Sequence, residues 1–214
     1  PIAVARSTVR IEIPFMIGVT ALLFYQGRDS SISLADGGVL MVAFAAYMMY
    51  LYTMAMKSNV DSDLEEPGLP LGRCLLGAVG GLALIIAGSN VTVGAATSIA
   101  TYAGLSERFI GLTIVALGTS LPELFTSVAA ARRGNADIAI GNIVGSNIFN
   151  ILFVVGLSSL IIDIPFASAF NFDTYVALGA AVLLWLCVLR TQRLQRWAGA
   201  LMLMCYAAYL GYIL

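Results

Sequence analysis

Long apolar segments dominate this chain of 214 residues and restrict the folds that are open to it. Hydrophobic residues make up 60% of the chain and charged residues only 11%, and the mean hydropathy is +0.93. About 20 apolar residues in a row can cross a bilayer as a helix, which satisfies its own backbone polar groups without water. We therefore expect an all-α, polytopic membrane protein, and the composition excludes an ordinary soluble domain.

The hydropathy pattern predicts seven transmembrane helices, five of which follow an acidic linker at 58–70. Their expected bounds are about 10–25, 36–56, 71–103, 109–131, 138–162, 174–189 and 197–214. Threading these helices through a bilayer places all Lys and Arg residues on one side except Arg28 and Arg108. Because basic residues accumulate in cytoplasmic loops, the linker is expected in the cytoplasm and the C-terminus outside.

The composition also argues against several kinds of function. The chain has no His and a net charge of −1, which gives no indication of nucleic-acid binding. Its three cysteines lie singly in apolar segments, where we expect them to be small buried side chains. The common zinc, haem and iron–sulfur sites and a Ser–His or His–metal catalytic set are therefore not expected, so we predict no cofactor and no enzyme.

An acidic residue lies in the middle of the fourth predicted helix. Glu123 ends the segment Gly118–Glu123, which reads GTSLPE. A carboxylate at this depth costs several kcal/mol on insertion scales, so it is a functional candidate by default. Gly118 and Pro122 are expected to break the helix and to free backbone carbonyls beside the carboxylate, as in the ion sites of secondary transporters.

Polar oxygens gather around this predicted break. Thr119 and Glu123 share a helix face, with Ser120 beside them. Hydroxyl, amide, carbonyl and carboxylate oxygens are the hard ligands that Ca²⁺ and Na⁺ require. The predicted metal ligands are Glu123, Thr119, Ser120, the carbonyl of Ala116, and Ser146 and Asn150 one turn apart on the next helix.

Helix packing explains part of this pattern equally well. Ser and Thr in membrane helices often hydrogen-bond their own backbone or a neighbouring helix. Asn142 and Asn147 fit interhelical hydrogen bonds as well as a site, and Gly141 and Gly145 fit close helix contact.

The second and seventh predicted helices resemble each other. Residues 37–52 align with residues 199–214, and the alignment matches Ala45–Tyr47 with Ala207–Tyr209. Chance similarity between two helices rich in Ala and Tyr remains an alternative. A true repeat predicts two halves of opposite orientation, because the second unit, 71–214, contains an odd number of helices. Residues 1–57 are then the last two helices of a first half, and about 90 residues of that half are expected to be missing.

Three segments resemble the α-repeat of the calcium/cation antiporter superfamily, in particular its sodium/calcium exchanger family with bacterial inner-membrane members. They are FIGLTIVALGTSLPE at 109–123, RRGNADIAIGN at 132–142 and GSNIFN at 145–150. The resemblance implies helices four to ten of a ten-helix inverted-repeat fold, with one α-repeat at about 109–160.

The resemblance also implies exchange of Ca²⁺ for Na⁺ by alternating access, in a cell inner membrane. Glu123 would be the principal Ca²⁺ ligand, and Thr119, Ser120, Ala116, Ser146 and Asn150 would complete half of the site. Asn150 stands where the better-known exchangers usually have Asp, so H⁺ and K⁺ remain open as counter-ions.

Two other functions remain open from the sequence, a cation channel and a non-transporting membrane scaffold. The expected partners are the lipid bilayer, Ca²⁺, monovalent cations and the missing N-terminal half. That half is supplied either by the same protein or by self-association, and residues 1–214 by themselves are not expected to transport.

Overall fold

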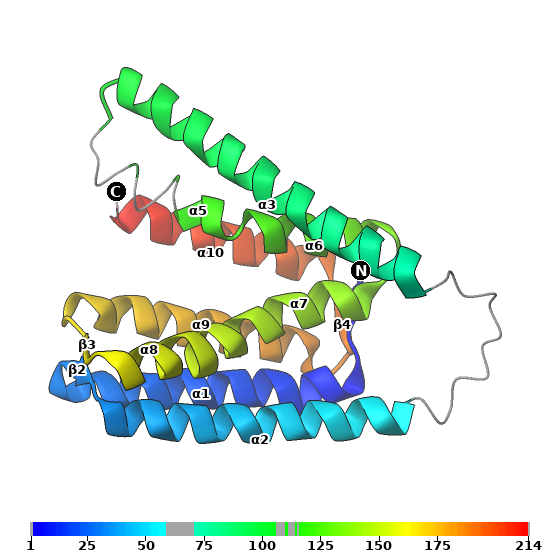
Figure 1. The fold of residues 1–214 in the computed structure, drawn as a ribbon, viewed down its shortest axis with the longest axis horizontal. Coiled ribbons are helices and arrows are strands. Elements are labelled where there is room, and N and C mark those ends of the chain that lie inside the picture. Colours follow the sequence, from blue (N-terminus) through cyan, green and yellow to red (C-terminus); the bar gives the residue numbers. More distant parts are fainter. Residues whose placement is uncertain (1, 59–70, 106–109, 111–113, 115, 214) are drawn as a thin grey trace.

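The protein is a bundle of long helices joined by short turns (Figure 1). The computed structural model describes residues 2–58, 71–105, 110, 114 and 116–213, so most of the linker 58–70 lies outside the described residues. The α-helices are α1 (Ile13–Gln26), α2 (Leu34–Ser58), α3 (Leu71–Tyr102), α5 (Ala116–Thr119), α6 (Leu121–Arg132), α7 (Ala136–Phe149), α8 (Gly156–Ile161), α9 (Ala169–Leu189) and α10 (Arg196–Ile213).

Two helices are extended by turns of π-helix. The turn η1 (Thr8–Glu12) precedes α1, and η4 (Asn150–Val155) joins α7 to α8. Within the described residues, five continuous helical segments are long and apolar enough to cross a membrane: Thr8–Asp29, Leu34–Lys57, Gly72–Tyr102, Ala136–Ile161 and Phe170–Leu189. They coincide with five of the seven predicted spans, which makes this a multi-pass membrane protein.

The two remaining predicted spans are helical in the parts that the structure describes. The fourth is divided into α5 and α6, and the seventh is α10. The sixth predicted span begins earlier than expected, at Ala169 rather than at Thr174. The added first turns contain the polar residue Asp173, which accepts a hydrogen bond of 2.8 Å from the Tyr209 hydroxyl of α10. This bond satisfies the carboxylate inside the helix.

Short strands fasten the helix ends together in two equivalent places. β1 (Ile2–Ala3) pairs with β4 (Arg193–Leu194), and β2 (Ser31–Ile32) pairs with β3 (Ile164–Pro165), both antiparallel. The offset between residues 37 and 199 carries β1 onto β3 and β2 onto β4. It also carries the register of one pair onto the register of the other. Each strand thus pairs with the non-equivalent strand of the other repeat unit, as expected for two units related by a pseudo-two-fold axis.

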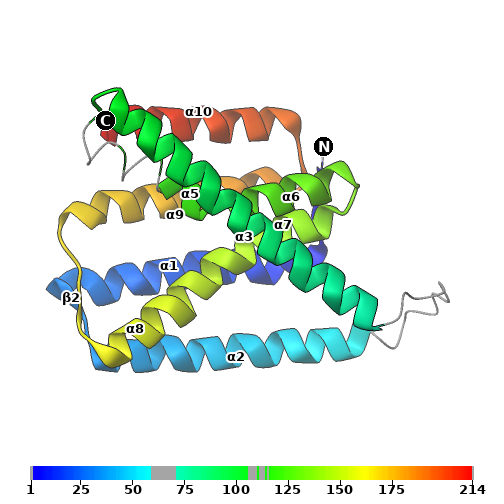
Figure 2. The ribbon, with the colours of Figure 1, turned by 45° about the horizontal axis from the view of Figure 1, so that its top comes forward.

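The buried core lies where α1, α7, η4 and α9 meet. Ile13, Val144, Ile148, Leu152 and Val188 are fully buried there. Figure 2 shows the continuous helix of α7, η4 and α8 crossing obliquely over α1 and ending beside α2, while α3 crosses the outside of α5 and α6. Most residues of α3 are exposed, so this long helix is held by one narrow face.

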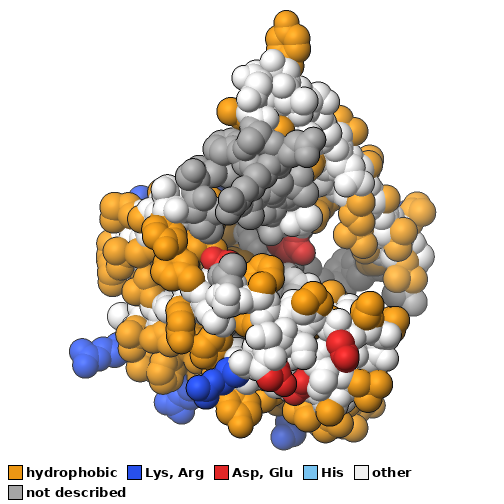
Figure 3. Space-filling model, turned by 90° about the vertical axis from the view of Figure 1, so that its left-hand side faces the viewer, with side chains coloured by type: hydrophobic (Ala, Val, Ile, Leu, Met, Phe, Trp, Pro, Cys, Tyr) orange, Lys and Arg blue, Asp and Glu red, His pale blue; other side chains and the backbone are white. Residues whose placement is uncertain are grey.

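Apolar side chains cover much of the outer surface (Figure 3). Leu76 and Leu84 of α3 are both 76% exposed, and Leu203 of α10 is 71% exposed. A bilayer is the solvent that suits such a surface, since hydrocarbon solvates these side chains without penalty. The prediction of buried cysteines is wrong for the same reason. Cys74 and Cys205 are exposed and Cys187 is half-buried, because in a membrane an apolar segment can face lipid as well as protein.

Candidate cation site

The helix that carries Glu123 is broken where the sequence predicted. α5 ends at Thr119, and α6 begins at Leu121 with Pro122 in its first turn. Between them Ser120 has φ −96° and ψ 1°, which is outside helical geometry. Pro122 lacks the N–H that would continue the helical ladder, so the break releases backbone carbonyls beside the Glu123 carboxylate.

Gly118 allows α3 to approach this break closely. A Cβ atom at Gly118 would overlap the side chain of Val93 on α3. Gly118 itself is buried, whereas Thr119 and Ser120 are exposed. The glycine therefore brings the long helix against the break and leaves the two hydroxyl-bearing residues accessible.

Glu123 lies in the first turn of α6 and is half-buried. Its Oε2 atom is buried and has no hydrogen-bond partner among the described residues. The N-terminus of α6 offers a positive dipole end to the carboxylate. A buried carboxylate oxygen without a donor is costly, so this one calls for a cation or another partner that the described residues do not supply.

Asn142 fixes the hairpin between α6 and α7. Its side-chain Nδ2 donates to the backbone carbonyl of Glu123 at 3.1 Å and to the Ser127 hydroxyl at 3.0 Å. The sequence left Asn142 open between packing and a site. The structure makes it the residue that holds the Glu123 turn against the next helix. Asn142 and Glu123 lie at similar distances from the tight turn between α6 and α7, and this spacing could have predicted the bond.

The other two predicted ligands follow Asn142 along the same helix. Ser146 is half-buried one turn beyond it, and Asn150 is exposed two turns beyond it. Because α6 and α7 run antiparallel, this direction along α7 corresponds to moving from Glu123 back toward Ser120. Among the described residues, no hydrogen bond joins the side chain of Ser146 or Asn150 to Glu123.

Asn150 is also the first residue of the π-helical turn η4. Such turns widen a helix locally and leave backbone groups without their usual partners, and they are frequent at functional sites. Ala116 lies at the start of α5, three residues before its end, so its carbonyl faces the break region along the chain. In the described part of the chain no cluster of three His, Cys, Asp or Glu side chains is present.

The buried polar residues that the sequence analysis missed include Ser89 and Glu12. Ser89 of α3 is only 6% exposed, and its hydroxyl has no hydrogen-bond partner among the described residues. Glu12 of η1 is 9% exposed and accepts a hydrogen bond of 3.0 Å from Thr8. Thr8 and Glu12 are four residues apart, a helical spacing that could have predicted their bond.

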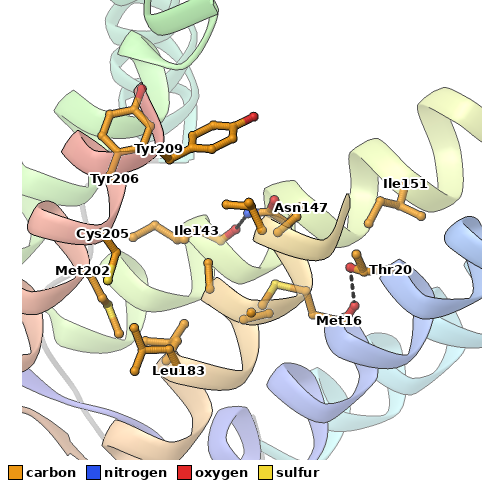
Figure 4. A pocket seen from close by; sticks show the side chains of 16 residues that line it. Met16, Thr20, Ile143, Asn147, Ile151, Leu183, Met202, Cys205, Tyr206 and Tyr209 are labelled. Carbon is orange, nitrogen blue, oxygen red and sulfur yellow. Dashed lines mark hydrogen bonds between the residues drawn. The ribbon is translucent and has the colours of Figure 1, made fainter. Parts of the chain in front are cut away.

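An apolar cavity of about 570 Å³ lies apart from Glu123, between α1, α7, α9 and α10 (Figure 4). Two of its polar side chains hydrogen-bond within their own helices, and the Tyr209 hydroxyl of α10 donates to Asp173 of α9. Thr20 donates to the Met16 carbonyl at 2.8 Å, and Asn147 donates to the Ile143 carbonyl at 2.8 Å. The remaining lining is mostly aliphatic and aromatic, so the cavity suits an apolar group and not an ion.

Known proteins resemble this chain over nearly its whole length. Residues 74–214 match the family described as "Sodium/calcium exchanger protein". The putative antiporter CaxA of Alkalimonas amylolytica is 37% identical over 98% of this chain, which spans 69% of that relative. The inner membrane protein YrbG of Escherichia coli (strain K12) is 37% identical over 75% of the chain and 52% of its own length.

Solved structures of the sodium-calcium exchanger NCX_Mj share the fold. One of them, soaked with Na⁺ and Sr²⁺, superposes with a TM-score of 0.79 at 28% identity. The match covers 99% of this chain and 67% of the exchanger. The chain therefore spans about half to two thirds of the length of these relatives.

Proposed function

Because the chain belongs to the sodium/calcium exchanger protein family, we propose that it is the larger part of a secondary transporter that exchanges Ca²⁺ for Na⁺. One observation carries this proposal. The carboxylate of Glu123 stands at the helix break between α5 and α6, and its buried Oε2 has no partner among the described residues. A carboxylate in this position is suited to receive a desolvated cation.

We propose that Glu123 is the principal ligand and that neutral oxygens complete this half of the site. The other members are the hydroxyl groups of Thr119, Ser120 and Ser146, the amide of Asn150 and the carbonyl of Ala116. Their support is the break at Ser120 and the antiparallel hairpin fixed by Asn142. All of these atoms are hard oxygen ligands, which suit Ca²⁺ and Na⁺.

Charge balance couples the two ions in the proposed mechanism. Glu123 supplies one negative charge, and an equivalent carboxylate from the other half would bring the total to about two. Two charges match one Ca²⁺ or two monovalent cations, so a full load of both ions would leave uncompensated positive charge. The neutral Asn150 contributes no further charge, and for this reason H⁺ and K⁺ belong in the test beside Na⁺.

Alternating access in this proposal uses α3 as the moving element. It rests on α5 and α6 by a narrow face, and its remaining surface is exposed. We place the protein in a cell inner membrane, with the linker 58–70 in the cytoplasm and the C-terminus outside. The charge distribution of the sequence and the inner-membrane relative support this orientation and location.

A first-half helix is the proposed occupant of the apolar cavity. Between the two repeat units, α2 of the first packs on η4 and α8 of the second, and a Cβ at Gly37 would meet the Gly156 carbonyl at 2.9 Å. The residue equivalent to Gly37 is Gly199 on α10, and around Gly199 the space is open. If α10 packs in the same way, it needs a partner helix equivalent to η4 and α8. The repeat offset places the residues of that helix outside 1–214.

The cavity has the character that such a helix needs. It is lined by α9 and α10, which correspond to α1 and α2, and by the central helix α7. Its Thr20, Asn147 and Tyr209 side chains already have partners, and about a third to a half of each relative lies outside its match to this chain. We therefore favour a helix of the first half over a second copy of this chain.

Replacing Gly199 with Leu is expected to weaken this association by about tenfold, because an overpacked helix contact loses 1–3 kcal/mol. The assay is co-purification of tagged 1–214 with the part of CaxA that lies outside its match to this chain. Gly211→Leu is the matched control, since Gly211 also has open space and lies on the opposite face of α10. Equal retention by both variants, or co-purification of an untagged copy of 1–214 instead, would contradict the proposal.

The transport function is tested by ⁴⁵Ca²⁺ uptake into sealed vesicles that contain the complete gene product. Uptake should follow an opposing Na⁺ gradient and should cease when that gradient is dissipated. Uptake driven instead by H⁺ or K⁺ would reassign the counter-ion. Conductance without obligatory counter-transport would identify a channel and refute exchange.

A further inference from the structure

The long helix α3 turns one narrow stripe toward the ion site. Of its described residues only Ser89 and Ala100 are buried, and Val93 between them is half-buried. These positions are four and seven residues apart, which places them on one helix face. The face contacts α5 and α6, because a Cβ at Gly118 would meet Val93.

Ser89 is the polar residue buried on this stripe, and its hydroxyl lacks the bond that other α3 hydroxyls make. Thr92, Ser98 and Thr101 each donate to the carbonyl four residues earlier in the helix, at 2.8–2.9 Å. All three are exposed. Ser89 is 6% exposed, yet its Oγ has no partner among the described residues, not even in its own helix. Burial without a partner is costly, so this orientation suggests a function.

The contact between the helices brings Ser89 toward Glu123. α3 and the α5–α6 segment run in opposite directions, and Val93 lies opposite Gly118 (Figure 2). Moving one turn back along α3 reaches Ser89, and moving one turn forward from Gly118 reaches the first turn of α6, where Glu123 lies. Two of the three buried unpartnered side-chain atoms in the described chain, Ser89 Oγ and Glu123 Oε2, therefore lie on helices that pack against each other.

We propose that Ser89 is a positioning residue of the ion site. By rotation of the two side chains, its hydroxyl donates a hydrogen bond to the Glu123 carboxylate and orients it for the cation. Ser89 thereby links the position of α3 to the occupancy of the site, and it adds a third helix to those that carry the proposed ligands. This inference rests on the exchange function proposed above.

The test compares Ser89→Ala with wild type in Ca²⁺ exchange by the complete gene product in vesicles. The KM for Ca²⁺ should rise about tenfold, the size expected for one lost hydrogen bond to a charged group, while the maximal rate is retained. Ser89→Thr keeps a hydroxyl and should restore the KM. Ser98→Ala is the matched control, because Ser98 is exposed on the same helix and bonds only to the Gly94 carbonyl.

A second readout does not depend on turnover. In a background without native cysteines, Ser89→Cys should react with a small thiol reagent more slowly when Ca²⁺ is present, whereas Ser98→Cys should react equally with and without Ca²⁺. An unchanged KM in Ser89→Ala, or an equal shift in Ser98→Ala, would overturn the inference. Loss of protein from the membrane at unchanged KM would assign Ser89 a structural role only. Absence of exchange in the wild type would instead refute the proposed function.

Discussion

Glu123→Gln is expected to abolish Ca²⁺ exchange while the protein still folds and inserts. Gln keeps the shape of the side chain but removes the negative charge that balances the cation. Removing one partner of a buried charge pair costs about 3 kcal/mol or more, which corresponds to at least roughly a 100-fold loss of affinity. Folding should persist because Asn142 bonds to the backbone carbonyl of Glu123, and the buried Oε2 has no partner to lose.

The measurement is gradient-driven ⁴⁵Ca²⁺ uptake in vesicles, normalised to the amount of protein in the membrane. Asp137→Asn is the matched control. It removes one carboxylate from the same hairpin, but Asp137 is exposed in the first turn of α7. This control should exchange at nearly the wild-type rate. Normal exchange by Glu123→Gln would end the assignment of Glu123 as the principal ligand.

Local patterns in the sequence were sufficient for most of the fold. Apolar length located the spans, and Gly118 with Pro122 located the break to within two residues of Ser120. The likeness between residues 37–52 and 199–214 also predicted an offset that the two strand pairs obey. These three signals depend on backbone chemistry or on a repeated sequence. They can be recognised without knowing which helices contact each other.

Partner choice between helices could not be predicted in this way. The bond from Asn142 to the Glu123 turn depends on the hairpin register, and the burial of Ser89 depends on how α3 packs on its neighbours. Hydropathy also does not distinguish lipid from protein as the surroundings of an apolar residue. The misassigned cysteines follow from this limit.

The second large effect is expected on stability. Gly37→Leu should destabilise the folded chain by about 3 kcal/mol, the upper range for overpacking a tight contact. A side chain at Gly37 would meet Ser159 and would bring its Cβ to 2.9 Å from the Gly156 carbonyl. The second of these groups is backbone, so relief requires α2 and α8 to separate. The measurement is the thermal midpoint of the detergent-solubilised protein, followed by size-exclusion chromatography.

Gly38→Leu is the control for this variant. Gly38 is the next residue of the same helix, and it has open space around it. Equal midpoints for Gly37→Leu and Gly38→Leu would contradict the packing of α2 on α8.

The equivalent substitution on α10 makes the comparison sharper. Gly37→Leu should destabilise residues 1–214 alone, because its partner helix belongs to the chain. Gly199→Leu should leave 1–214 unchanged and should have an effect only when a first-half helix is present. Equal losses of thermal midpoint by both variants in 1–214 alone would mean that the space around Gly199 is already filled.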